Sequence, residues 1–219
     1  MRTAHILVEG QTEETFVRDV LGPHLLGFRL HLNPVVVSTK RVKSGLKFKG
    51  GVTDYAKVRR ELRRLLNDSS AVAVTTMIDY YGLPDDFPGV ASLPRSRTCY
   101  SRVEHLENAL AADIHDRRFL PYFSLHEFEA LLFVAPQLIE TAVEEKGVAD
   151  RLAALAASPE EVDDGPDTHP AARLFAVAPR YRKAVHGPLI AGRIGLSGMR
   201  PRCPHLDVWV SRLESLGPG

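Results

Sequence analysis

AHILVEGQTEETFVRDVL, residues 4–21, contains two successive patterns that indicate secondary structure. Its first part, residues 4–8, is short and nearly all apolar, which is typical of a buried parallel strand. Thr12 then precedes two glutamates and apolar residues at helical spacing, which predicts a capped helix. The stretch therefore predicts a strand, a turn and a helix in succession.

The same alternation continues along the chain. Further strands are predicted over 30–39, 71–78 and 119–125, and further helices over 55–66, 103–114 and 126–133. Strands that alternate with helices favour a mostly parallel sheet with helices on both faces. After residue 136 only short helices and breakers follow. We therefore predict an α/β, Rossmann-like domain over residues 1–135 and a helical C-terminal appendage over residues 136–219, packed on it.

Composition excludes several classes of protein. The chain is 44% hydrophobic and 25% charged, as in ordinary soluble domains. No run approaches the roughly 18 apolar residues of a membrane span, and the N-terminus lacks a signal-peptide pattern, so we expect a cytoplasmic protein without a membrane partner. The two cysteines, Cys99 and Cys203, are too few for a disulfide framework or a four-thiolate zinc site.

Charge is segregated along the chain. Residues 1–66 carry a net charge of +7 and residues 168–219 carry +6, whereas residues 67–126 carry −3 and residues 127–167 carry −9. Within the first block, five Lys or Arg fall between residues 40 and 49 among glycines, a composition typical of an exposed loop. Such a loop could hold a phosphate backbone or could be a solvated surface hairpin.

Carboxylates follow the predicted strands. Glu9 comes directly after the first strand and Glu13 four positions later, Asp79 ends the third strand, and Glu127 and Glu129 follow the fourth. In a parallel sheet these side chains meet at one edge, where oxygen ligands suit Mg²⁺ or Mn²⁺. The expected chemistry is phosphoryl transfer with one or two ions. Each carboxylate also has a structural interpretation, such as a helix cap or first-turn residue.

The segment after the fourth strand leaves alternatives open. Two positions turn a helix by about 200°, so we expect only one of Glu127 and Glu129 to be a ligand if the helix has begun there. Ser124 with Glu127 also fits a capping box, and His126 could be a base or a structural histidine. Dinucleotide, P-loop and nucleophile motifs are absent from the sequence.

Three motifs carry a resemblance to a known family. ILVEGQTEETFV at 6–17, MID at 77–79 and LHEFEALLF at 125–133 resemble the Toprim-type catalytic domain. More closely, the chain resembles an uncharacterised bacterial family of Toprim-like proteins that is related to the OLD-family nucleases and is often encoded beside an AAA- or ABC-type ATPase. Further motifs extend the resemblance almost to the end of the chain: DYYGLPDDFPG, EEVDDGPDTHPAARLF, YRKAVHGPLIAGRIGL and MRPRCPHLDVW.

The resemblance implies a Mg²⁺- or Mn²⁺-dependent nuclease acting on DNA or RNA. Glu9 takes the place of the Toprim glutamate, Glu13 that of the second glutamate of OLD-like proteins, and Asp79 that of the first Asp of D-x-D. Glu129 matches a glutamate in an F-E-x-x-L-L context, with Glu127 as the fallback. Catalytic roles are thus implied for Glu9, Glu13, Asp79 and Glu129, and metal binding for these four and Glu127.

One position departs from the family pattern. Tyr81 stands where the Toprim motif carries its second Asp, which puts a second ion in doubt. Asp85 or Asp86 could compensate, although a loop is a poor place to fix a ligand.

Basic residues are the candidates for nucleic-acid binding. Lys47 and Lys49 are expected to follow a phosphate backbone, and Arg95, Arg97 and Arg102 to neutralise the scissile phosphate. The appendage offers a phosphate-binding wall or, alternatively, residues engaged in surface salt bridges: Arg182, Lys183, Arg200, Arg202 and His205.

Three functions follow as hypotheses. The first is a metal-dependent Toprim-like nuclease, the effector of an ATPase-coupled bacterial defence system against phage. The second, motivated by Tyr81, is a degenerate module that binds a partner ATPase or nucleic acid without cutting. The third is a small-molecule phosphohydrolase or nucleotidyl transferase.

Overall fold

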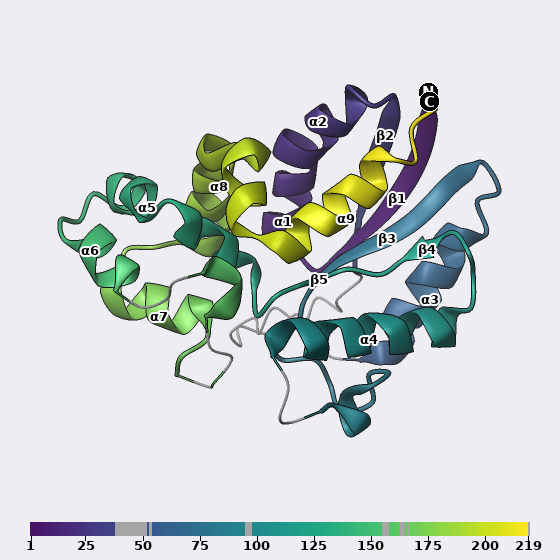
Figure 1. The fold of residues 1–219 in the computed structure, drawn as a ribbon, viewed down its shortest axis with the longest axis horizontal. Helices are drawn as coiled ribbons and strands as arrows, with labels where there is room; N and C mark the ends of the chain where they lie inside the picture. Colours follow the sequence, from purple (N-terminus) through teal and green to yellow (C-terminus); the bar gives the residue numbers. More distant parts are fainter. Residues whose placement is uncertain are drawn as a thin grey trace, which may run out of the picture.

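The protein is built on a five-stranded parallel sheet with the order β2-β1-β3-β4, and β5 pairs with β3 beyond β4 (Figure 1). This computed structural model describes residues 1–37, 52, 54–94, 98–154, 158–162, 165 and 167–218. The strands are β1 Arg2–Val8, β2 Leu30–Val36, β3 Ala71–Asp79, β4 Phe119–Leu120 and β5 Phe123–Ser124.

Helical elements connect the strands and make up the C-terminal part of the described chain. In the first part they are α1 Gln11–Phe16, the π-helical η1 Val17–Leu21, α2 Gly22–Leu26, α3 Tyr55–Leu66, η2 Val90–Ser92 and α4 Cys99–Ile114. They continue with η3 Phe128–Val134, α5 Pro136–Val143, α6 Val148–Ala153, η4 Pro159–Glu161, α7 Pro170–Val177, α8 Lys183–Met199, η5 Arg200–Arg202 and α9 Pro204–Glu214. The α/β fold class predicted from the sequence is confirmed.

Successive strand residues point to opposite sides of the sheet, and helices cover both sides. Ile6 and Val8 belong to a core under α1, α2, α8 and α9, whereas Leu7 belongs to a second core under α3 and α4 (Figure 1). Parallel strands buried on both faces are expected to be nearly continuous apolar runs, as β1 and β3 are. β1 and β3 are paired in parallel in the middle of the sheet, so their carboxyl ends lie side by side.

The prediction of one continuous strand over 119–125 is wrong, because two short strands, β4 and β5, are formed there. Pro121 lies between them and has no backbone N–H to donate to a ladder. The Thr76 hydroxyl of β3 takes part there instead, because it donates to the Tyr122 carbonyl and accepts from the Tyr122 N–H, both at 2.8 Å.

Two helix starts also differ from the prediction. Gly10 is the N-cap of α1 and no side chain caps it, so Thr12 lies inside the helix. After β5 the helix is of the 3₁₀ type and begins at Phe128 instead of residue 126. Glu127 precedes it in extended conformation, which places Glu127 and Glu129 in different environments.

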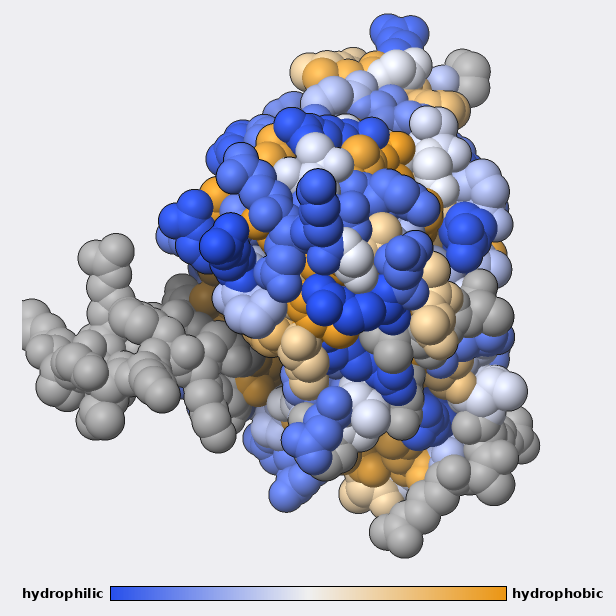
Figure 2. Space-filling model, turned by 90° about the vertical axis from the view of Figure 1, so that its left-hand side faces the viewer, coloured by the Kyte–Doolittle hydropathy of each residue, from blue (hydrophilic) through white to orange (hydrophobic). Residues whose placement is uncertain are grey.

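The C-terminal helices pack against the sheet. Ile190, Met199 and Trp209 belong to the same core as Ile6, and the Trp209 indole N–H donates to the Thr75 hydroxyl at 2.9 Å. Seen from the side of these helices, the surface is mostly hydrophilic, with hydrophobic residues in small separate areas (Figure 2).

The division between residues 135 and 136 stays a prediction. Among the described residues, no helix is both long and apolar enough to cross a membrane.

Candidate functional site

Glu9 and Asp79 meet at the carboxyl ends of the two central strands. Val8 of β1 lies opposite Met77 of β3, so the residues that follow them leave the sheet at the same edge. The backbone N–H of Asp79 donates to Glu9 Oε2 at 3.0 Å. This bond fixes the Glu9 carboxylate beside the end of β3.

Glu13 reaches the same edge from the first turn of α1. Its side chain is buried, and an added Cβ on Gly10 would lie 3.3 Å from Glu13 Oε2. The Glu13 charge acts on Glu9 and Asp79, whose pKa values it raises. Glycine at the end of β1 thus leaves room for a carboxylate that lies near other acidic side chains.

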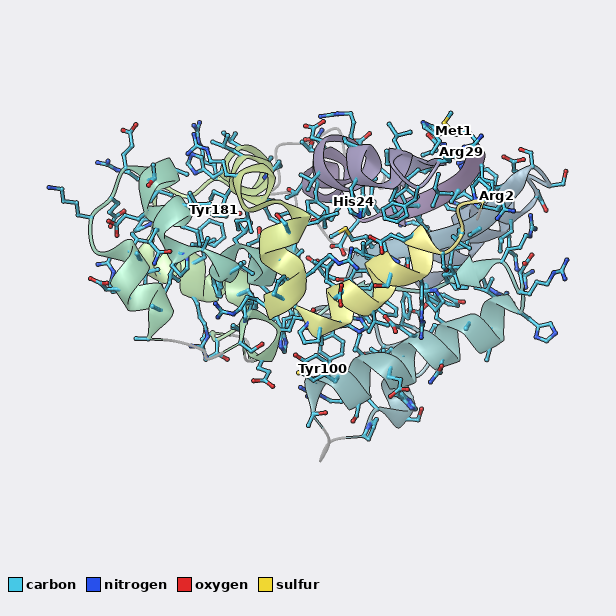
Figure 3. The ribbon with its side chains drawn as sticks, turned by 45° about the horizontal axis from the view of Figure 1, so that its top comes forward. Met1, Arg2, His24, Arg29, Tyr100 and Tyr181 are labelled. Atoms are coloured by element: carbon cyan, nitrogen blue, oxygen red, sulfur yellow. The ribbon has the colours of Figure 1, made fainter. Side chains whose placement is uncertain are left out.

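Asp79 and Glu129 share a lysine from α8. Asp79 Oδ1 accepts from the Phe128 N–H at 2.9 Å, and Asp79 Oδ2 lies 3.6 Å from Lys183 Nζ. Lys183 Nζ is 3.0 Å from Glu129 Oε2, and the Tyr181 hydroxyl donates to Glu129 Oε1 at 3.3 Å. Tyr181 lies beside α8, among the C-terminal helices (Figure 3). We call Glu9, Glu13, Asp79 and Glu129 the strand-end cluster.

The strand-end cluster holds more negative charge than its lysine can balance. Burial raises the pKa of Glu9 to about 7, and the nearby Glu13 carboxylate adds to this rise against the Asp79 hydrogen bond. Burial also raises the pKa of Asp79 and Glu129, with Lys183 acting in the opposite direction. Burial disfavours the charged form of Lys183, but the surrounding carboxylates outweigh it and raise the lysine's pKa.

Gly187 brings α8 close to the cluster. An added Cβ on Gly187 would lie 3.1 Å from both Thr12 Cγ2 and the Tyr181 hydroxyl. The absent side chain therefore lets α8 approach α1 closely enough for Lys183 to reach the carboxylates.

Glu127 accepts its hydrogen bonds from the start of α7, while its charge still raises the pKa of Glu9 and Glu129. Its Oε2 accepts from His169 Nδ1 at 2.7 Å and from the Ala171 N–H at 2.8 Å. Tyr81 stacks on the His169 ring at 4.3 Å between centroids. Tyr81, at the position of the expected second Asp, thus packs on the histidine that is hydrogen-bonded to Glu127.

The other residues predicted near the acidic edge have separate surroundings. His126 Nε2 contacts the Glu160 carbonyl at 3.2 Å, a structural contact to backbone. Ser124 and Glu127 form no capping box, because Glu127 bonds to α7. Asp85 and Asp86 are exposed in the loop after β3.

The predicted nucleic-acid residues lie mostly outside the described residues: this holds for Lys47, Lys49, Arg95 and Arg97. Arg102 is half-buried on α4, with its guanidinium 5.7 Å from the centre of the Tyr80 ring. In the appendage, Arg200 pairs with Asp207 and Glu214 of α9, and His205 pairs with Glu107. The basic residues of the appendage therefore do not form one wall, and Lys183 alone joins the cluster.

The donor set suits a hard cation, although a closed metal geometry is not formed. Within the described part of the chain, no group of three or more His, Cys, Asp or Glu is arranged to hold a metal ion. Lys183 lies between two of the carboxylates instead. The cluster nevertheless offers only carboxylate oxygens, which Mg²⁺ and Mn²⁺ prefer, and an excess of negative charge.

Sequence reasoning missed the roles of Lys183, Tyr181 and Gly187. All three come from the start of α8 or just before it, far from the strand ends in sequence, and no local pattern announces their contacts. The only available signal was that they fall within one motif, YRKAVHGPLIAGRIGL.

One comparison with known proteins identifies a family. The family model described as Domain of unknown function (DUF4276) matches residues 8–214. Searches of curated proteins and of solved structures gave no match. The chain therefore belongs to the DUF4276 family, and the match includes every member of the strand-end cluster together with Lys183.

Proposed function

We propose that the chain is a Mg²⁺- or Mn²⁺-dependent nuclease of the Toprim type that cleaves nucleic-acid phosphodiesters. The carrying observation is the strand-end cluster, in which four carboxylates at or just after the ends of β1, β3 and β5 surround, among the described residues, the Lys183 ammonium. Three of these carboxylates have raised pKa values, and perturbed pKa values are concentrated at functional sites. A divalent cation would relieve this excess of charge.

The residues of the cluster would divide the work. Glu9, Glu13 and Asp79 would hold the ion, which when bound polarises the phosphate and lowers the pKa of water. The pKa of Glu9, about 7 in the metal-free chain, would fall on binding of the ion, because a cation stabilises the ionised carboxylate. Lys183 is half-buried at the edge of the cluster, where its charge would stabilise a phosphate oxygen.

Other parts of the proposal rest on the sequence resemblance alone. These are the partner ATPase and the role in defence against phage, whereas the cytoplasmic location is proposed from the composition of the sequence. The basic residues Lys47, Lys49, Arg95, Arg97 and Arg102 would bind the DNA or RNA.

The test is cleavage of labelled DNA and RNA with Mg²⁺ or Mn²⁺. We expect Glu9→Ala and Asp79→Ala each to abolish metal-dependent cleavage, because each removes a ligand. Glu14→Ala is the matched control, since Glu14 lies beside Glu13 on α1 but outside the cluster. Circular dichroism checks folding. Cleavage retained in both folded cluster variants would contradict the proposal.

A second function is favoured by Lys183. Its ammonium already bridges Asp79 and Glu129, as expected of a module that binds a partner ATPase or nucleic acid without cutting. Such a module would bind no divalent ion at millimolar concentration in calorimetry. Its affinity for nucleic acid would also be unchanged by Glu9→Ala.

A further inference from the structure

We propose, on the basis of the metal site proposed above, that the Lys183 ammonium fills the position of a second cation. The site would then take a single divalent ion through Glu9, Glu13 and Asp79. Glu129 would be the counter-ion of the lysine and not a metal ligand.

The first support is the geometry around Lys183. Its Nζ lies between Asp79 Oδ2 at 3.6 Å and Glu129 Oε2 at 3.0 Å, so it spans two carboxylates as a bridging cation would. Both oxygens of Glu129 are engaged, one by Lys183 and the other by the Tyr181 hydroxyl. A second divalent ion at this place would meet a like charge at close range in a buried site, where screening is weak.

The second support is independent and comes from Tyr81. This is the position at which the resembled motif carries its second Asp, and here an aromatic ring stacks on His169. The chain has therefore lost a carboxylate on the β3 side of the site. It holds an ammonium from α8 at the same site, so the two changes together make the site more positive by two charges, the charge that a second divalent ion would supply.

The third support is how firmly Lys183 is positioned. It is the first residue of α8, and close packing at Gly187 sets the distance of this helix from α1. Tyr181 is buried and holds the same glutamate. The lysine is thus part of the built site and not a surface residue that happens to lie nearby.

The experiment is calorimetric titration of Mn²⁺ into the full chain, with stoichiometry as the readout. We expect one ion per chain in the wild type, two in Lys183→Met, and one again in the double variant Lys183→Met/Glu129→Gln. Arg182→Met, which removes the exposed neighbouring charge, is the control and should keep one ion. Glu129→Gln alone should also keep one ion, with affinity weakened by about tenfold at most, the effect of losing a supporting group.

The possible results separate this inference from the proposed function. Two ions in the wild type, or a stoichiometry that stays at one in folded Lys183→Met, would overturn only the inference. Loss of saturable binding in Glu129→Gln would also overturn it, and this variant decides the matter if Lys183→Met does not fold. No binding in any folded variant would overturn both.

Discussion

Two kinds of buried carboxylate occur in this molecule. Glu127 and Glu160 each accept from the first turn of a helix: Glu127 from Ala171 of α7, and Glu160 from the His205 and Leu206 N–H groups of α9 at 3.0 Å. The strand-end cluster differs in that its acidic side chains face one another, although Asp79 also accepts from the N–H of Phe128, the first residue of η3. Helix N-termini stabilise negative charge, so a carboxylate there needs no further cation.

The partners of a buried carboxylate distinguish structural from functional acidic residues. Burial raises the pKa of Glu160 as it raises that of Glu9, but the two backbone bonds from α9 counteract it. For Glu9 one backbone bond, from Asp79, likewise lowers the pKa, but the neighbouring Glu13 carboxylate adds to the effect of burial. The informative property is therefore the set of partners and not burial alone.

The largest effect on stability is expected from a capping carboxylate. Glu160→Ala leaves two buried N–H groups of α9 without an acceptor and should lower the free energy of unfolding by about 3 kcal/mol. Urea denaturation measures it. Mn²⁺ affinity should not change in the folded variant. A stability loss below about 0.5 kcal/mol would contradict the distinction between helix-capping carboxylates and those of the strand-end cluster.

Replacing a carboxylate of the strand-end cluster should raise the free energy of unfolding instead of lowering it. The pKa of Glu9 is raised from 4.5 to about 7, so the folded state binds the extra proton and loses stability as pH rises between these values. Glu13, Asp79, Lys183 and Glu127 are the charged groups that face it. Glu9→Gln mimics the protonated form. Without metal it should therefore be about 2 kcal/mol more stable than the wild type at pH 8.

The pH dependence supplies the control for this prediction. The difference between Glu9→Gln and the wild type should shrink as pH falls towards 4.5, because both carry a neutral side chain there. Urea denaturation in EDTA at several pH values measures it. A wild type more stable than the variant at pH 8 would place Glu9 with the capping carboxylates.

The smallest effect is expected from the packing that brings α8 to the cluster. Gly187→Ala puts a methyl group against Thr12 and Tyr181 and should cost about 1 kcal/mol. Gly192→Ala on the same helix is the matched control, since its Cβ meets no atom within 4 Å. The control should be neutral or stabilising by up to about 1 kcal/mol, because alanine favours helix. Equal thermal stabilities of the two variants would contradict close packing at Gly187.

The strands and the edge where the carboxylates meet could be predicted from local patterns. The run AVAVTTMID is long and apolar enough to indicate a buried strand, and parallel strands bring their carboxyl ends together. The helices α3 and α4 also follow from local patterns, at 55–66 and 103–114. These features depend on residues close in sequence, which is why they were accessible.

The remaining features depend on tertiary contacts. Lys183 joins Asp79 and Glu129 only because α8 packs on α1, and Glu127 finds its partners on α7. The π-helical η1 also has no periodic signature in the sequence. Pro121 is an exception, because a proline within the fourth predicted strand indicates an interruption from the sequence alone.

The position of Lys183 in the chain has a consequence for biosynthesis. All four carboxylates of the strand-end cluster leave the ribosome before this lysine, since the latest of them is Glu129. Until α8 is made, Lys183 cannot balance the charge that gathers where β1 and β3 end, and protons or dissolved cations can take its place. We therefore expect the nascent N-terminal part to complete this edge last, after the C-terminal helices have docked.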